Sequence, residues 1–248
     1  MKTKTVNIKT VDGSCDAYVA HPDQPAPGVL LLMDIFGVRP YLREMTEHLA
    51  SHGYYVVTPN LFYRDKHAPL VPDSLFPLAP DQFTAVMQQL RSYMQKFTPE
   101  KSVEDLQAIV DFLKTEKEVR PGKVGVTGYC LGGGVAIRAA SKIPNLFSAV
   151  ASFHAARLAT DAPNSPHLQI GKIKAELYVG HADNDEGMPP EQQELLRQAL
   201  IAGHVRFEAE LYPGAAHGFT MKDLPRYNQQ ATEKHWQKLL ALLKRNLH

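Results

Sequence analysis

Hydrophobic and polar positions follow a pattern along the chain that is typical of a layered α/β protein. Short apolar runs with the character of strands occur at Gly28–Met33, Tyr54–Thr58, Lys123–Thr127, Phe147–Ser152, Ala175–Gly180 and Arg206–Tyr212. Segments with helical periodicity lie between or after them, at residues 40–52, Asp81–Lys96, Pro99–Glu118, Gly132–Ser141, Pro190–Ala202 and about Asn228 to Leu247. Strands that alternate with helices predict a mostly parallel central sheet with helices on both faces.

The segments outside this alternation complete the expected organisation. Two strands, Thr5–Lys9 and Cys15–Ala20, are predicted near the N-terminus, with a turn at residues 11–14 between them. Residues 60–80 carry four prolines and little periodicity, which predicts a long surface excursion. We find no internal repeat, and the length is compatible with a single domain over residues 1–248.

Composition and charge exclude several classes of function. The formal net charge is +1 and the Lys and Arg residues are scattered, so no nucleic-acid partner is expected. The chain has neither a signal peptide nor a run of about 18 apolar residues, so we expect a cytoplasmic protein without membrane association. Its two cysteines, Cys15 and Cys130, form no C-x-x-C pair, and no dinucleotide or P-loop motif occurs. No metal and no cofactor is therefore expected, while the oligomeric state stays open.

The strongest chemical signal is the segment GYCLGGG at residues 128–134, which lies directly between the predicted strand KVGVT and the following helix. It matches the nucleophile elbow G-x-S-x-G, with Cys130 in place of serine. Residues without Cβ are needed because so tight a turn brings backbones close together. The N-terminus of the following helix favours a thiolate. Cys130 is therefore the predicted nucleophile.

A nucleophile of this kind needs a base and an acid, which follow it along the chain in the order acid, then histidine. His217 comes directly after the last predicted strand, flanked by small residues, and is the predicted base. Two aspartates follow the strand that ends at Gly180. We favour Asp183, because it is nearer to that strand end, and keep Asp185 as the alternative.

The developing oxyanion of acyl transfer needs two backbone donors. One is expected from Leu131, the residue after the nucleophile, and the other from Ile35, in the loop after the first parallel strand. Asp34 precedes Ile35 and has a functional role or caps a turn.

The segments GYCLGG, DIFG, PNLFYR, GHAD and YPGAAHGF together resemble the dienelactone hydrolase (carboxymethylenebutenolidase) family nearly end to end. The resemblance implies an α/β-hydrolase fold without a large lid domain, no metal, and a triad of Cys130, His217 and Asp183. It also implies oxyanion donors at Ile35 and Leu131.

Two positions depart from the family pattern. The family has a glutamate where this chain has Asp34, and that carboxylate partners the resting thiol. The family also has a substrate-binding arginine where this chain has Met221, while Arg91 and Arg64 lie in the region of a second such arginine. Met221 would present an apolar surface to the substrate, so neutral esters and lactones are expected to react about as well as carboxylated ones.

These observations predict a hydrolase that cleaves an ester or lactone bond in a small molecule. A general carboxylesterase or thioesterase with the same triad is one alternative. The other is a protein that binds a ligand or senses thiol chemistry without catalysis, because a fold does not fix a function.

Overall fold

A computed structural model describes residues 1–248 and contains one eight-stranded sheet. The strand order is β1-β2-β4-β3-β5-β6-β7-β8. β1 and β2 pair in antiparallel fashion, as do β2 and β4, and the other pairs are parallel. The strands are β1 (Lys2–Thr10), β2 (Gly13–His21), β3 (Gly28–Leu32), β4 (Tyr55–Pro59), β5 (Val124–Tyr129), β6 (Phe147–Phe153), β7 (Glu176–Asn184) and β8 (Phe207–Ala216).

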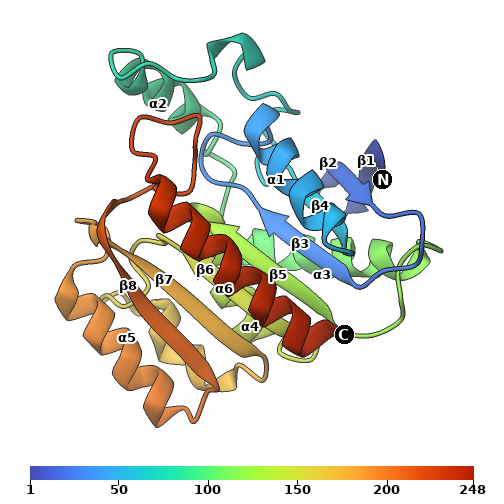
Figure 1. The fold of residues 1–248 in the computed structure, drawn as a ribbon. Helices are drawn as coiled ribbons and strands as arrows, with labels where there is room; N and C mark the ends of the chain where they lie inside the picture. The colour runs from blue at the N-terminus through green and yellow to red at the C-terminus, as the bar shows by residue number, and fades with distance from the viewer.

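Helices cover both faces of this sheet (Figure 1). They are α1 (Pro40–Ser51), α2 (Phe83–Ser92), α3 (Pro99–Thr115), α4 (Leu131–Lys142), α5 (Pro190–Ala202) and α6 (Gln229–Leu247), with short 3₁₀ helices at Asp73–Leu75 and Pro166–Lys172. α1 and α6 lie in front of the sheet in Figure 1, while α3 and α4 lie behind it. The predicted α/β architecture, with a mostly parallel sheet between helical layers and no large lid domain, is confirmed.

The apolar runs form the centre of this arrangement, as their sequence predicts. Every residue of β3 and β4 is buried, because helices cover both faces of these strands. On α1 the spacing of Leu42, Met45 and Leu49 places all three on the face that packs against the sheet, and all three are buried.

Residues 60–80 are more buried than the predicted surface excursion would be. The segment has no regular structure apart from the 3₁₀ turn at Asp73–Leu75, but five of its apolar side chains are buried. These are Leu61, Phe62, Leu70, Val71 and Leu78. The segment leads to α2, which lies at the top of Figure 1, beyond the carboxyl ends of the parallel strands. Residues 60–80 therefore form a packed wall above this sheet edge. The sequence had predicted a surface excursion instead.

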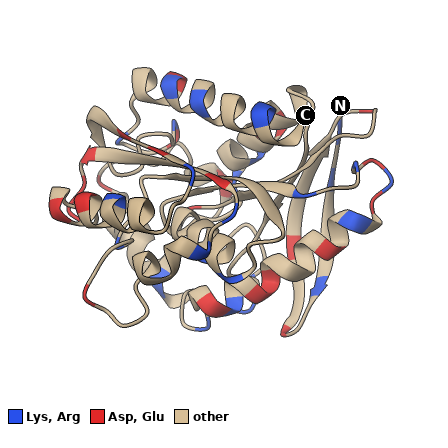
Figure 2. Ribbon diagram, turned by 90° about the horizontal axis from the view of Figure 1, so that it is seen from below, with Lys and Arg blue, Asp and Glu red and all other residues tan.

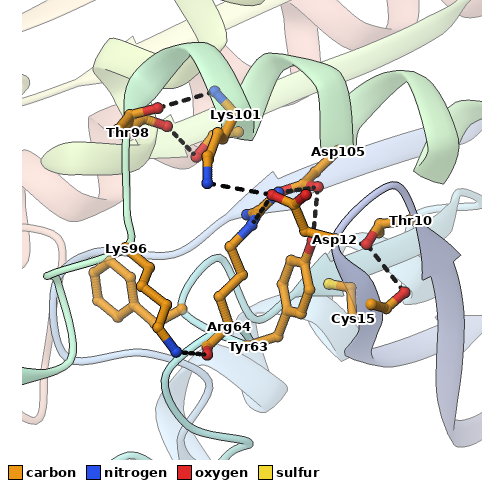
Figure 3. Close-up of polar contacts among 12 residues, drawn as sticks. Thr10, Asp12, Cys15, Tyr63, Arg64, Lys96, Thr98, Lys101 and Asp105 are labelled. Carbon is orange, nitrogen blue, oxygen red and sulfur yellow. Dashed lines mark hydrogen bonds and ion pairs between the residues drawn. The ribbon is translucent and has the colours of Figure 1, made fainter.

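A buried ion pair attaches this wall to the rest of the molecule (Figure 3). Arg64 donates two hydrogen bonds to Asp105 on α3, at 2.7 and 2.9 Å, and a third to Asp12 in the β1–β2 turn, at 2.8 Å. The Tyr63 hydroxyl donates to the same Asp105 carboxylate at 2.9 Å. The side chains of Arg64 and Asp105 are only 5% and 2% exposed. This fixed geometry joins three segments that are distant in the sequence.

Charged residues elsewhere are interspersed. In Figure 2 segments of both colours are spread over the molecule, and blue predominates only on α6, the long helix that ends at the C label. None of the helices combines the length and apolar character that a membrane crossing would require.

Removal of the buried carboxylate on α3 should destabilise the protein strongly. Asp105→Ala should lower the free energy of unfolding by about 3–5 kcal/mol, because it leaves a buried guanidinium without its main partner. Asp111→Ala on the same helix removes an exposed pair with Lys114 and should cost less than about 1 kcal/mol. Urea unfolding of both variants measures the difference, and similar losses would contradict a structural role for the Arg64–Asp105 pair.

Candidate active site

Cys130 lies in a strained turn between β5 and α4. Its φ is 53° and its ψ is −114°, a backbone conformation that non-glycine residues rarely adopt. Glycines are required on both sides of Cys130, because a side chain at these positions would collide with nearby backbone atoms. A Cβ on Gly128 would lie 2.2 Å from the Gly132 carbonyl oxygen, and a Cβ on Gly132 would lie 2.5 Å from that of Met33. The predicted strand–elbow–helix turn is therefore present, and its backbone lifts Cys130 above the sheet edge.

The elbow opens into a cavity of about 560 Å³ that both predicted oxyanion residues also line. Cys130, His217, Ile35 and Leu131 all contribute to its wall. Much of the remaining wall is apolar and comes from α2 and the segment after it, through Phe83, Met87, Met94 and Phe97. Segments distant in the sequence thus meet at the carboxyl ends of the parallel strands, where ligands of such sheets bind.

His217 follows β8 and is held from two sides. Its Nδ1 lies 2.7 Å from Asp185 Oδ2, and its ring also interacts with the Cys130 side chain. Burial alone would lower the pKa of His217, but the hydrogen bonds with Asp185 and Cys130 and the charges of both groups raise it to about 10. The site therefore favours the charged imidazolium form of His217.

The expectation that Asp183 contacts the histidine is wrong, and the alternative, Asp185, occupies that place. β7 does not end at Gly180 but continues to Asn184, so Asp183 still belongs to the strand. Its carboxylate is exposed and accepts a hydrogen bond from the Gly214 N–H at 2.9 Å. Asp185 is the first residue beyond the strand and is buried, and its Oδ1 accepts from the Gly187 N–H at 2.9 Å.

Asp34 lines the cavity but is paired with an arginine. Arg39 donates to both of its oxygens, at 2.7 and 3.0 Å, and also to both oxygens of Asp223, at 2.6 and 3.1 Å. Burial would lower the pKa of Arg39, but the two carboxylates raise it, so the guanidinium stays charged. Asp34 is a possible partner of the Cys130 thiol by the family pattern, but here both of its oxygens accept hydrogen bonds from Arg39 instead.

Met221 is also not where the family pattern would place a substrate contact. Its side chain is fully buried in the core, and it does not line the cavity. Arg64 is bound to Asp105 and Asp12, and Arg91 does not line the cavity either. Three other arginines do line it, which the sequence reasoning did not find: Arg138, Arg157 and Arg226.

These three arginines differ from the buried arginines of the fold. Arg39 and Arg64 are paired with carboxylates, whereas none of the three in the cavity wall is. Arg138 Nη1 donates to the main-chain oxygen of Asn164 at 2.7 Å, and burial lowers the pKa of its guanidinium. A guanidinium at a cavity wall without a carboxylate partner can bind an anionic group of a ligand. The hydrophobic periodicity of α4 does not indicate that Arg138 binds an anionic ligand, because Arg138 lies on a partly exposed face of the helix.

A second histidine at the cavity was also missed. His154 directly follows β6 and lies at the same sheet edge as the elbow. Its position directly after a predicted strand could have indicated in the sequence that it lies near the site. No group of three or more His, Cys, Asp or Glu side chains in the molecule is arranged to hold a metal ion.

The sheet order, the helices on both faces and the elbow at Cys130 define an α/β-hydrolase fold. The model of the dienelactone hydrolase family matches residues 15–247. A Synechocystis protein named "Putative carboxymethylenebutenolidase" is 30% identical over 100% of this chain and 98% of its own length. An Escherichia coli protein of the same name is 28% identical over 96% of this chain and 85% of its own. This chain belongs to the dienelactone hydrolase family, a family of hydrolases.

The three-dimensional fold is also similar to that of a solved structure with the same family name. The crystal structure titled "Putative Dienelactone Hydrolase" from Klebsiella pneumoniae superposes with a TM-score of 0.82, covering 98% of both chains at 24% sequence identity. At this level of identity the superposition supports the fold.

The pairing of His217 with Asp185 can be tested without any substrate. Asp185→Asn should lower the pKa of His217 from about 10 towards the ordinary histidine value of about 6.5, because an uncharged amide no longer stabilises the imidazolium. Asp183→Asn should leave the pKa of His217 unchanged. NMR titration of the His217 imidazole in both variants measures this, and the reverse ranking would return the role to Asp183.

Proposed function

We propose that this protein hydrolyses carboxylic esters or lactones, with Cys130 as nucleophile, His217 as acid and base, and Asp185 as the residue that orients His217. The observation that carries the proposal is the 2.7 Å contact between Asp185 and His217 Nδ1, with His217 and Cys130 both lining one cavity. A buried carboxylate on Nδ1 leaves the other ring nitrogen for the nucleophile, which is the arrangement that acyl transfer requires.

The reaction proceeds in two halves. The Cys130 thiolate attacks the carbonyl carbon, and the C–O bond to the leaving group breaks while the His217 imidazolium donates its proton to the leaving alkoxide. The acyl group remains as a thioester on Cys130. The now neutral imidazole accepts a proton from water, whose oxygen attacks the thioester and releases the acid, and the thiolate–imidazolium pair is restored. A lactone follows the same steps, except that its leaving alkoxide stays attached to the acyl group.

Stabilisation of the oxyanion is assigned to the backbone N–H groups of Ile35 and Leu131. Both residues line the cavity beside Cys130. Leu131 is the first residue of α4, so its N–H is among those at a helix N-terminus that point towards negative charge. The buried Asp34–Arg39 pair supports the loop on the other side. Asp34 Oδ1 accepts from the Phe36 N–H at 2.9 Å, which fixes the backbone next to Ile35.

The cavity also favours a class of substrate. Its apolar side, formed by Phe83, Met87, Met94 and Phe97, suits a hydrophobic acyl or alkyl group, and its arginines suit an anionic group. We therefore infer an amphipathic substrate, which replaces the expectation of equal reactivity towards neutral compounds. That expectation depended on a contact with Met221, which is buried elsewhere.

Substitution of the nucleophile should abolish the reaction. Cys130→Ala should lower kcat for a nitrophenyl ester by about 10⁴-fold or more, the scale of losses in established triads. Cys15→Ala is the control, because Cys15 is buried and burial raises the pKa of its thiol, so it should keep wild-type activity. A burst of nitrophenol that depends on Cys130 would establish the acyl-enzyme. Binding without a burst would indicate a protein that binds ligands without catalysis.

The charge of the substrate can be tested with one matched pair, a lactone with and without a carboxymethylene group. The unmodified protein should prefer the charged member by about 10- to 150-fold in kcat/KM, the contribution of one arginine–carboxylate contact. Arg138→Met should reduce this preference, while Arg91→Met, which changes an arginine outside the cavity, should not. Equal kcat/KM values for both lactones would contradict an anionic substrate.

A further inference from the structure

His154 is a buried histidine beside the active site that the proposed reaction does not use. It directly follows β6, is 1% exposed, and lines the same cavity as Cys130 and His217. Its φ is 39°, in the left-handed region that non-glycine residues rarely adopt, and its N–H donates to the Gly180 oxygen at 2.8 Å. A bulky residue in this conformation must be held there by contacts with its surroundings, and the contacts of its ring are among them.

The ring of His154 contacts the loop that carries His217. Its Nε2 lies 2.8 Å from Thr220 Oγ1, and its Nδ1 is buried without a partner. The ring meets His217 edge-on, with centroids 5.4 Å apart, and meets Phe219 in the same way at 5.2 Å. One imidazole thus contacts three residues of the loop, including the predicted base itself.

The other anchors of this loop come from elsewhere. The Tyr41 hydroxyl, from α1, donates to the Thr220 main-chain oxygen at 3.1 Å. Thr232, from α6, donates to the Phe219 oxygen at 3.0 Å. Both hold the backbone of the loop and neither contacts the His217 ring. The His154 ring contacts both the loop and the His217 ring, and it does so from the sheet edge at which the elbow lies.

We propose that His154 is a positioning residue that holds the His217 imidazole in the orientation that joins Asp185 to Cys130. The inference rests on the proposed role of His217 as acid and base. The hydrogen bond to Thr220 sets the height of the loop above the sheet, and the edge-on contact limits rotation of the His217 ring. Without these contacts the ring samples orientations in which one of its two hydrogen bonds is broken.

The charge state of His154 agrees with this role. Burial lowers its pKa well below the ordinary value, and the charges of His217 and His235 lower it further, so the ring stays neutral beside an imidazolium. The titratable groups whose charges act on His217 are Asp185 from the end of β7 and Cys130 from the elbow, and His154 faces it from the end of β6. The charged side chains Asp34, Arg138, Arg157 and Arg226 line the same cavity.

The chain offers a matched control for a buried histidine. His235 on α6 is 0% exposed, its Nε2 lies 2.8 Å from the Tyr129 hydroxyl, and its Nδ1 also has no partner. Its aromatic neighbours are Tyr129, Phe153 and Trp236, not His217. His235→Ala therefore removes a ring of the same size and burial without removing a contact to the base.

The experiment compares His154→Ala, Thr220→Val and His235→Ala with the unmodified protein. Thr220→Val keeps the volume of a fully buried side chain and removes only its hydroxyl, so it tests the hydrogen bond even if His154→Ala does not fold. The first readout is the NMR titration of His217, which needs no substrate. The second is kcat and KM for ester hydrolysis.

The expected result is a lower His217 pKa, by about one unit, in His154→Ala and Thr220→Val, because weaker hydrogen bonds to Asp185 and Cys130 stabilise the imidazolium less. kcat should fall about 10- to 100-fold while KM changes less than about threefold, because the loss concerns the chemical step. His235→Ala should leave the His217 titration unchanged. A wild-type His217 titration in both His154→Ala and Thr220→Val would overturn the proposal, including when kcat falls. If the unmodified protein hydrolyses no ester, the proposed function fails, and the titration still decides whether His154 positions the ring.

Discussion

The close approach of α4 to the ends of β3 and β5 is the constraint on which the site depends. At Gly128 and Gly132 the backbones are so near that a single Cβ would lie within about 2.5 Å of a carbonyl oxygen, a separation that sterics forbid. Because the helix begins so close to the sheet, its first residue must be reached through a left-handed backbone conformation at Cys130. The strain at Cys130 is the consequence of this packing, and it places the thiol above the edge where the other loops converge.

Convergence of those loops depends on a second buried interaction. Arg39 binds Asp34, next to the proposed oxyanion donor Ile35, and also Asp223, in the segment between His217 and α6. One guanidinium thus ties the loop after β3 to the loop after β8. A buried charge cluster of this kind is a weak source of stability, because desolvation offsets the attraction between the charges. Its directional hydrogen bonds do fix geometry, which is what two loops on opposite sides of a nucleophile require.

The sequence allowed the fold and the places of Cys130 and His217 beyond the strand ends to be predicted, because they depend on local patterns. Apolar runs identify strands, and the glycine spacing around Cys130 identifies the elbow. Asp185 was harder to predict. Hydrophobicity ends at Gly180, but pairing with β8 carries β7 on to Asn184, so the strand ends four residues later than expected and the aspartate that contacts His217 is Asp185 instead of Asp183. Met221 and the cavity arginines were not predictable, since side-chain direction in a loop or on a half-exposed helix face depends on tertiary packing.

The electrostatics of the cavity follow from which charges already have partners. Arg39 pairs with both Asp34 and Asp223, so one positive charge faces two carboxylates, and Asp185 is paired with His217 and the Gly187 N–H. Each of these carboxylates therefore already has hydrogen-bond donors, and of the three only Asp34 lines the cavity. The arginines of the cavity wall form no ion pair with a carboxylate, so they add positive charge to that of His217 in the same wall. On the function proposed above, an anionic substrate group would be attracted to these arginines. Its apolar part would then contact the side chains of α2 and of the segment after it, which line the same cavity.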